Sequence, residues 1–155
     1  MQQPDTPAPP ARLKLTRDHS QLALLDAWLN EFSNTCELPA RTRFSLDLVL
    51  TEAVTNVMDH SRITRAAGSN NAGEIEVICA LRDGCVSAEL IDDGPPFDPT
   101  ASAPVVLPAN LDEARPGGLG IHLMRRYTRS MEYMREQDRN VLRMTLPVAP
   151  ESSVC

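Results

Sequence analysis

The chain has 155 residues, enough for one domain with a sizeable core but few for two. With 42% hydrophobic and 23% charged residues it has the composition of an ordinary globular protein, and no apolar run approaches the roughly 20 residues of a membrane span. A net charge of −6 argues against a nucleic-acid partner, because binding a phosphate backbone requires a concentrated basic face.

The cysteines and the first eleven residues bear on the compartment. The four cysteines show no CxxC spacing, so neither a zinc site nor a disulfide framework is indicated. Residues 1–11 are rich in proline and alanine and contain no apolar run typical of a signal peptide. We therefore expect a disordered lead, no membrane association and a cytoplasmic protein.

The first half of the chain predicts one strand and two helices. Residues 11–17 alternate apolar and polar side chains, which favours a strand. Ser20 is a suitable N-cap for a helix that runs to about Asn34. The apolar stripe expected on this first helix consists of Leu22, Leu25, Trp28, Leu29 and Phe32. Pro39 suits the first turn of a second helix that reaches about Ser61. The apolar side of that second helix is expected to include Phe44, Leu46, Val49, Leu50, Ala53, Val54, Val57 and Met58.

The middle of the chain predicts a hairpin followed by a long connection. Residues 74–93 read as two strands joined at the turn signal Asp83-Gly84. The stretch from about 95 to 117 is rich in proline and alanine and shows no sustained periodicity. Long connections of this kind are uncommon in compact domains unless they are functional lids or disordered segments.

The remaining segment predicts a helix and a final hairpin. The helix opens around Gly118 and reaches about Arg129, and residues 130–136 and 140–147 pair across 137–139. Helices and hairpins in this order indicate an α+β fold, a two-layer sandwich with the helices on one face of a mostly antiparallel mixed sheet. We expect one domain over 12–148, followed by a disordered tail.

Four polar residues interrupt the predicted second helix: Glu52, Asn56, Asp59 and His60. Side chains four positions apart share a helix face, so the four can converge on one ligand. The amide oxygen of an asparagine is a good ligand for Mg²⁺, and a nearby carboxylate can accept a proton from an attacking hydroxyl. A solvated stripe on an amphipathic helix would explain the same residues without a ligand.

Two further clusters follow in the chain, LIDDGPPFDP and GGLGIHLMRR. Asp92 could accept a hydrogen bond from an amino group such as that of adenine, and Gly94 permits close backbone approach, although Asp-Gly-Pro is also a turn signal. The glycines at the start of the predicted helix offer free N–H groups and the positive end of the helix dipole to an anion. A single GxG is unspecific.

In this order, LTEAVTNVMDHS, LIDDGPPFDP and GGLGIHLM resemble the N box and the two glycine boxes of the histidine-kinase-like ATPases, the GHKL or Bergerat-fold superfamily. Within it the chain is most similar to the anti-sigma-factor serine/threonine kinases. The resemblance covers about residues 12–147 and implies a Bergerat ATP-binding fold that uses ATP and Mg²⁺.

The resemblance also implies roles for individual residues. Glu52 matches the general base, Asn56 the Mg²⁺ ligand and Asp92 the acceptor of the adenine amino hydrogen bond. Residues 95–117 match the lid over the nucleotide. The remaining nucleotide contacts fall on the glycine boxes and the end of the lid: Gly94, Gly118, Leu119, Gly120 and Arg115. A solvent-exposed role for Arg115 fits equally well.

The chain departs from the family pattern in two places. Family members often open the last strand with Gly-Thr, whose hydroxyl helps a water to hold the adenine, whereas this chain has Asn140-Val141-Leu142. That auxiliary contact is therefore not expected. Asp59 stands where a neutral or apolar residue is expected, and we assign it no role.

The resemblance implies a cytoplasmic anti-sigma factor that binds a sigma factor and phosphorylates a serine or threonine of an anti-sigma-factor antagonist, a STAS-type protein. It also allows a homodimer. An alternative is a nucleotide-dependent binding module that acts as an anti-sigma switch without phosphoryl transfer. A metal hydrolase built on Glu52, Asp59, His60 and His122 is a third reading, which lacks HExxH spacing.

Overall fold

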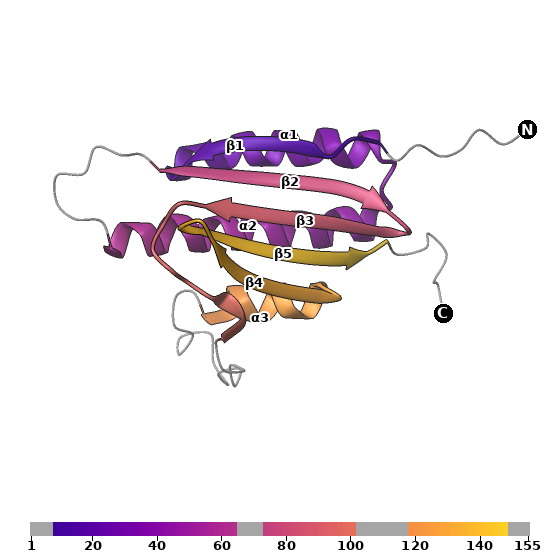
Figure 1. The fold of residues 1–155 in the computed structure, drawn as a ribbon. Coiled ribbons are helices and arrows are strands. Elements are labelled where there is room, and N and C mark those ends of the chain that lie inside the picture. Colours follow the sequence, from indigo (N-terminus) through magenta and orange to yellow (C-terminus); the bar gives the residue numbers. More distant parts are fainter. Residues whose placement is uncertain (1–7, 65–72, 102–117, 149–155) are drawn as a thin grey trace, which may run out of the picture.

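A computed structural model describes residues 8–64, 73–101 and 118–148 (Figure 1). Most of the predicted lid, including Arg115, and the two ends of the chain lie outside these ranges. In chain order the elements are β1 Ala11–Thr16, the 3₁₀ turn η1 His19–Gln21, α1 Leu22–Thr35, α2 Ala40–Thr64, β2 Glu74–Arg82, β3 Cys85–Asp92, the 3₁₀ turn η2 Pro99–Ala101, α3 Gly118–Tyr127, β4 Ser130–Glu136 and β5 Arg139–Pro147.

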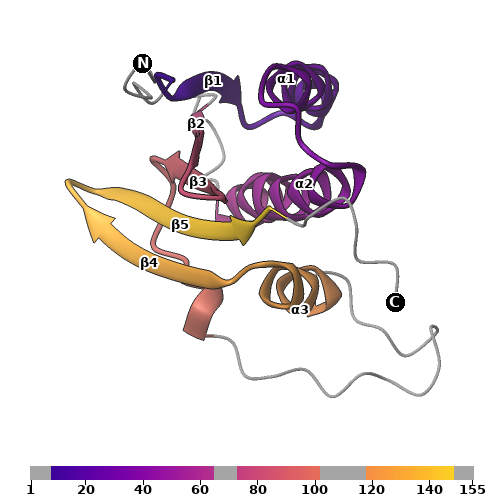
Figure 2. The ribbon, with the colours of Figure 1, turned by 90° about the vertical axis from the view of Figure 1, so that its right-hand side faces the viewer.

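The five strands form one sheet in the order β1-β2-β3-β5-β4. All four pairings in the described part of the chain are antiparallel, so no parallel pair accompanies them there. Turned by 90°, the ribbon shows the three helices on one side of the sheet, with α2 between α1 and α3 (Figure 2). The predicted α+β sandwich with helices on one face is confirmed.

Two-residue turns set the register of both hairpins. Asp83 and Gly84 both have positive φ, 50° and 71°, as a type I′ turn requires. The second hairpin turns on Gln137 and Asp138, with φ of 48° and 60°, although neither is a glycine. Arg139 already belongs to β5, so the predicted three-residue connection is one residue too long.

The first helix follows the predicted stripe but begins later. Leu25, Leu29 and Phe32 are buried, and Leu22 and Trp28 pack against the same core. Ser20 is not the N-cap: Asp18 accepts a hydrogen bond from the Ser20 backbone N–H at 2.8 Å and caps η1 instead. The N-cap residue of α1 is Gln21, whose side chain makes no capping hydrogen bond.

The second helix, α2, supplies the centre of the core. It is three residues longer than predicted, and its buried apolar side chains are Leu46, Val49, Leu50, Ala53, Val54 and Met58. Phe44 is not among them. It is 59% exposed and makes an edge-to-face contact with Tyr127 of α3, the ring centroids lying 6.1 Å apart. No helix in the described ranges is long and apolar enough to cross a membrane.

The third helix ends at Tyr127, two residues before the predicted end. Thr128 closes it with a hydrogen bond from its backbone N–H to the Met124 carbonyl at 3.1 Å. The Arg129 N–H already pairs with the Thr145 carbonyl of β5 at 2.7 Å. The chain therefore leaves the helix as soon as a strand partner is within reach.

The buried side of α2 should dominate stability. Leu50 is fully buried, so Leu50→Ala should lower the free energy of unfolding by about 2–5 kcal/mol through lost transfer energy and a residual cavity. Leu24→Ala makes the same change on α1 at a side chain that is 51% exposed, and should cost less than about 0.5 kcal/mol. Urea unfolding followed by circular dichroism measures both, and equal losses would contradict the assignment of the core.

Candidate functional site

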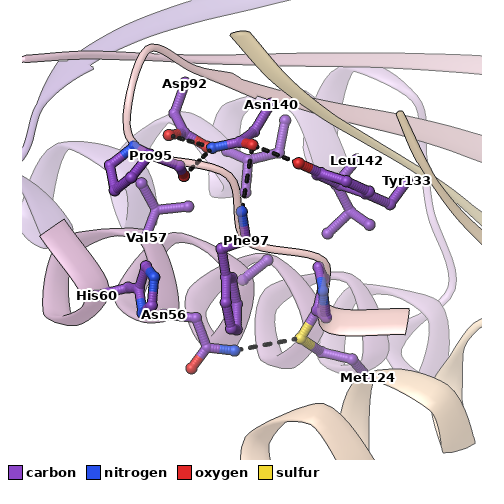
Figure 3. A pocket seen from close by; sticks show the side chains of 13 residues that line it. Asn56, Val57, His60, Asp92, Pro95, Phe97, Met124, Tyr133, Asn140 and Leu142 are labelled. Carbon is purple, nitrogen blue, oxygen red and sulfur yellow. Dashed lines mark hydrogen bonds between the residues drawn. The ribbon is translucent and has the colours of Figure 1, made fainter. Parts of the chain in front are cut away.

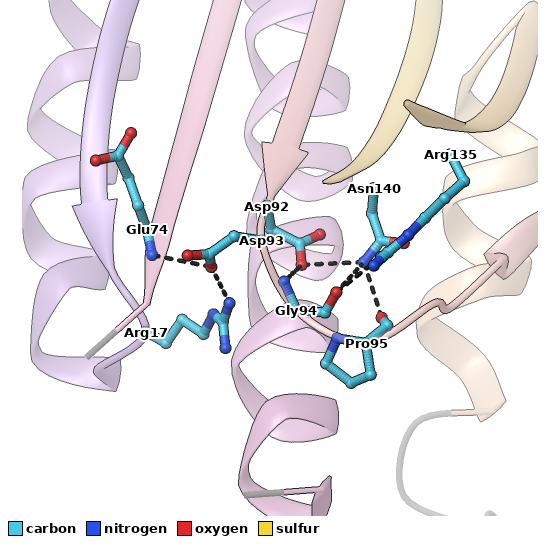
Figure 4. Close-up of polar contacts among 8 residues, drawn as sticks. All are labelled: Arg17, Glu74, Asp92, Asp93, Gly94, Pro95, Arg135 and Asn140. Atoms are coloured by element: carbon cyan, nitrogen blue, oxygen red, sulfur yellow. Dashed lines mark hydrogen bonds and ion pairs between the residues drawn. The ribbon is translucent and has the colours of Figure 1, made fainter. Parts of the chain in front are cut away.

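Asp92, the last residue of β3, points into the space between the sheet and the helices. It continues the alternation of Val86, Ala88 and Leu90, which are all buried, and is itself only 6% exposed. Its Oδ1 accepts hydrogen bonds from the Gly94 backbone N–H at 2.8 Å and from Asn140 Nδ2 at 3.1 Å (Figure 4). A buried carboxylate thus stands at the end of a strand, with one oxygen engaged by the protein.

Asn140 faces Asp92 from the neighbouring strand. The two residues are direct register partners of β3 and β5, and Asn140 is 5% exposed. From the motif alone, position 140 indicates only the loss of Gly-Thr, and its contact with Asp92 is not predicted. The available signal was strand alternation: positions 140, 142, 144 and 146 share a face, so an asparagine among Leu142, Met144 and Leu146 has to be buried and hydrogen-bonded.

A small, mostly apolar cavity opens beside these two residues (Figure 3). Its polar lining consists of Asn56, His60, Asp92 and Asn140. Its apolar lining consists of Ala53, Val57, Leu90, Pro95, Phe97, Pro99, Met124, Tyr133 and Leu142. About 30 Å³ is free, which is room for one or two water molecules.

The Phe97 ring takes up much of the space between the β3 end and α2. It reaches down from the loop toward α2 and lies against His60, the ring centroids being 4.5 Å apart (Figure 3). A flat ligand larger than a water molecule can enter the cavity only if the Phe97 ring moves. Because Phe97 is part of a loop that follows β3, rotation of its side chain is the smallest such change.

Glu52 and Asn56 of α2 lie against the first turn of α3. A Cβ on Gly120 would clash with Glu52 Oε2 and would lie 3.9 Å from Asn56 Oδ1. Asn56 Nδ2 contacts the Met124 sulfur at 3.9 Å, so the amide oxygen is turned the other way (Figure 3). With a glycine here, the Glu52 carboxylate can lie directly against the backbone of α3.

The other helix polar residues do not all join this group. Asp59 pairs with His19 at 2.9 Å between half-exposed side chains, so the expectation that all four polar residues converge is wrong for Asp59. His60 lines the cavity, and His122 is half-buried on α3. Within the described ranges no three His, Cys, Asp or Glu side chains gather as a metal site would require, which gives the hydrolase reading no support.

Asp93 has a different neighbourhood from Asp92, although the two are adjacent. Its side chain points to the other side of the strand, where it pairs with Arg17 and accepts a hydrogen bond from the Glu74 backbone N–H at 3.2 Å (Figure 4). These contacts join the end of β1 to the start of β2. Of the acidic pair, Asp92 faces the cavity and Asp93 anchors the sheet.

Two chemically different groups of residues lie in and beside the cavity. Asp92 lines it, with Gly94 two residues later in the chain. Asn56 also lines it and, together with Glu52, lies against Gly120 in the first turn of α3, which also holds Gly118 and Leu119. A carboxylate can accept a hydrogen bond from an amine, and the free N–H groups of a helix start favour an anion. The two groups together suit an elongated ligand with an amino-bearing ring and an anionic tail.

Comparison with known proteins agrees with this architecture. The family described as histidine kinase-like ATPase domain matches residues 15–146. The serine/threonine-protein kinase BtrW of Bordetella bronchiseptica is 33% identical over 125 residues, which cover 81% of this chain and 84% of that protein. The chain therefore belongs to the histidine-kinase-like ATPases, in the branch of the anti-sigma-factor serine/threonine kinases.

Two solved structures share the fold. The structure of the RsbU and RsbW domains of Rv1364c from Mycobacterium tuberculosis superimposes with a TM-score of 0.65 at 18% identity, over 96% of this chain and 35% of that one. The histidine kinase domain from the blue-light activated kinase EL346 of Erythrobacter litoralis gives a TM-score of 0.52 at 14% identity, over 84% of this chain and 62% of that one. This chain thus spans about a third of the first structure and about three fifths of the second.

The anchoring contacts of Asp93 predict a structural role. Asp93→Asn should lower the free energy of unfolding by no more than about 1 kcal/mol, since the carboxylate is 38% exposed and solvent screens its pair with Arg17. The loss should shrink in concentrated salt. Asp138→Asn, at the exposed β4–β5 turn, is the matched control and should be neutral. Thermal and urea unfolding at two ionic strengths test this, and a loss that does not depend on salt would contradict it.

Proposed function

We propose that this protein is an ATP-dependent serine/threonine kinase that phosphorylates an anti-sigma-factor antagonist and also binds a sigma factor as an anti-sigma factor. The observation that carries the proposal is the packing of Glu52 Oε2 against Gly120, with Asn56 Oδ1 beside it. It joins a potential base, a potential magnesium ligand and an anion-binding helix start in one place. The membership of a kinase branch supports the same conclusion.

Glu52 is proposed as the general base. It would take the proton from a serine or threonine hydroxyl of the antagonist as that oxygen bonds to the γ-phosphorus, while the bond to the β-phosphate oxygen breaks and ADP leaves. The glycines at the start of α3 let phosphate oxygens approach the backbone N–H groups there. Gly118, Leu119 and Gly120 are the residues that we assign to this contact.

Asn56 is proposed as the protein ligand of Mg²⁺. The residues fit the ion: the amide nitrogen of Asn56 is turned to the Met124 sulfur, which leaves the amide oxygen, close to Gly120 at the start of α3, available as a ligand. Magnesium commonly takes only one or two protein ligands besides water and phosphate. A magnesium ion held there supplies positive charge next to the phosphate oxygens. Asn56 would thereby orient the end of the substrate that reacts with the hydroxyl near Glu52.

At the other end of the cavity, Asp92 is proposed to accept a hydrogen bond from the adenine amino group, with Gly94 allowing the ring to approach the backbone. The apolar walls, Val57 of α2 and Leu142 of β5 among them, would cover the faces of the purine. Phe97 has to swing aside for the ring to enter. Residues 95–117 are proposed as the lid, with Arg115 at its end available to a phosphate.

The partners follow from the family and not from a contact in this chain. The proposed partners are a sigma factor and an anti-sigma-factor antagonist of the STAS type, with a homodimer as the proposed assembly, in the cytoplasm. Phosphorylating the antagonist would stop it from releasing the sigma factor. Because the kinase and the binding function are separable, variants of the site can distinguish a kinase from a binding module that transfers nothing.

The adenine assignment is tested at Asp92. Asp92→Asn replaces a carboxylate acceptor by an amide of nearly the same shape, so ATP affinity should fall by about ten- to a hundredfold, as expected for one hydrogen bond to a charged group. GTP should bind the wild type poorly, because guanine has a carbonyl where adenine has an amine. Calorimetry measures both. Asp93→Asn is the matched control, since its carboxylate faces away from the cavity, and equal ATP affinity of the Asp92 variant and the wild type would remove Asp92 from the site.

Glu52 and Asn56 separate transfer from binding. Glu52→Gln keeps the size of the side chain that fills the space at Gly120 but removes the base, so it should bind ATP normally and phosphorylate the antagonist about 10²–10⁴-fold more slowly. Asn56→Ala should weaken magnesium-dependent ATP binding as well as transfer. The measurements are calorimetry with Mg·ATP and transfer of radiolabel from ATP to serine or threonine of the antagonist.

Asp47→Ala is the control for these variants, because it removes an exposed carboxylate from the same helix outside the cavity and should change neither readout. A wild-type transfer rate in Glu52→Gln would contradict the assignment of the base. Wild-type protein that binds ATP and a sigma factor but transfers nothing to any antagonist would replace the kinase by the alternative, a nucleotide-dependent switch.

A further inference from the structure

Asn140 makes more hydrogen bonds than any other side chain around the cavity. Its Nδ2 donates to Asp92 Oδ1 at 3.1 Å and to the Pro95 carbonyl at 2.9 Å, with the Gly94 carbonyl at 3.5 Å. Its Oδ1 accepts from the Tyr133 hydroxyl, from Arg135 and from the Phe97 backbone N–H. We propose that Asn140 is a positioning residue for purine recognition, which fixes Asp92 and the start of the loop in the arrangement that receives the purine amino group. The proposal rests on the adenine role of Asp92 proposed above.

The contacts leave the Asn140 amide only one orientation. The distances to its oxygen are 2.6 Å from the Tyr133 hydroxyl, 3.0 Å from Arg135 Nη1 and 3.4 Å from the Phe97 nitrogen. Arginine and a backbone N–H can only donate, so a reversed amide would set its own N–H₂ group against two donors. The nitrogen must therefore point to Asp92. Tyr133 and Arg135 of β4 therefore fix the orientation of the Asn140 amide on β5. That orientation turns the amide N–H₂ group toward the Asp92 carboxylate on β3.

The Asn140 amide also gives the two oxygens of the Asp92 carboxylate different roles. Oδ1 already receives two hydrogen bonds, from the Gly94 N–H and from Asn140. The described residues supply no hydrogen bond to Oδ2, which leaves that oxygen to accept from a ligand. Without Asn140 the carboxylate would lose a donor that holds its plane, and either oxygen could turn toward the cavity.

Asn140 also fixes the backbone that carries Phe97. The Pro95 carbonyl and the Phe97 N–H both bond to its side chain, and Arg135 adds a bond to the Gly94 carbonyl at 2.7 Å. Because the backbone is held at these points, the cavity opens for a purine by rotation of the Phe97 ring. The amide thus keeps the recognition edge in place while the wall next to it moves.

A purely structural asparagine would satisfy buried backbone groups without affecting which base is bound. The two roles differ in the ratio of affinities for ATP and for purine riboside triphosphate, which lacks the 6-amino group and has nothing to donate to Asp92. Loss of overall structure lowers both affinities together and cancels in the ratio. Loss of Asp92 positioning lowers the ratio alone.

The experiment measures both nucleotides by calorimetry, with Mg²⁺, in the full chain. Asn140→Leu keeps the approximate size but removes every hydrogen bond, and should lower the ATP preference by about tenfold, to the level of Asp92→Asn. The double variant should be no worse than Asp92→Asn, because both changes remove one interaction. Asn140→Ser, which retains a hydroxyl and is easier to accommodate, decides the matter if the leucine variant does not fold, and should lower the preference about threefold or more.

Leu146→Ala is the matched control for destabilisation. Leu146 is fully buried on the same strand but pairs with Val86 at the opposite end from Asp92, so the variant should lower the melting temperature and leave the nucleotide ratio unchanged. An unchanged ratio in the Asn140 variants, with a lowered one in Asp92→Asn, would overturn the positioning role and leave the proposed adenine contact standing. An unchanged ratio in Asp92→Asn would overturn both.

Discussion

The site depends on one constraint: α2 packs at the same time against the core under the sheet and against α3. Leu46, Leu50 and Val54 repeat every four residues and are completely buried, which presses one side of the helix onto the core under the sheet. Glu52 and Asn56 repeat with the same spacing on another side and meet the first turn of α3. The same helix therefore forms part of the core and one wall of the cavity, and the absent side chain of Gly120 leaves space for the Glu52 carboxylate between the two helices.

The second fixed point of the cavity is a pair of strands in register. Antiparallel pairing puts Asp92 directly opposite Asn140, and the pleat turns both toward the helices. A slip of β3 by one residue would turn Asp93 inward in place of Asp92 and would bury its carboxylate away from Arg17, with which it pairs now. The register of β3 against β5 thus matters for the site, because it places the buried carboxylate opposite the buried amide.

Much of this was readable from the sequence. The alternation in residues 74–93, the turn at Asp83-Gly84 and the stripe of α1 gave the sheet and helices nearly to the residue, because each is a local pattern with a local cause. The errors arose where two local signals competed or a partner was remote. Asp18 caps a 3₁₀ turn that precedes α1, so Ser20 is not the helix cap. Phe44 lies exposed beside Tyr127, a contact between residues 83 positions apart that helical spacing alone cannot predict.

Asn140 shows why the site itself was only partly predictable. A motif comparison considers only the residue type at each position. By that criterion, Asn-Val-Leu in place of Gly-Thr indicates a lost contact. In the structure, the Asn140 amide donates a hydrogen bond to Asp92, the carboxylate that the motif identified. An asparagine can do so because it both donates and accepts, so it can join Asp92 on one side to Tyr133 and Arg135 on the other. The departure from the pattern is therefore a different way of holding the same carboxylate, and it depends on β4 residues that no box of the family pattern includes.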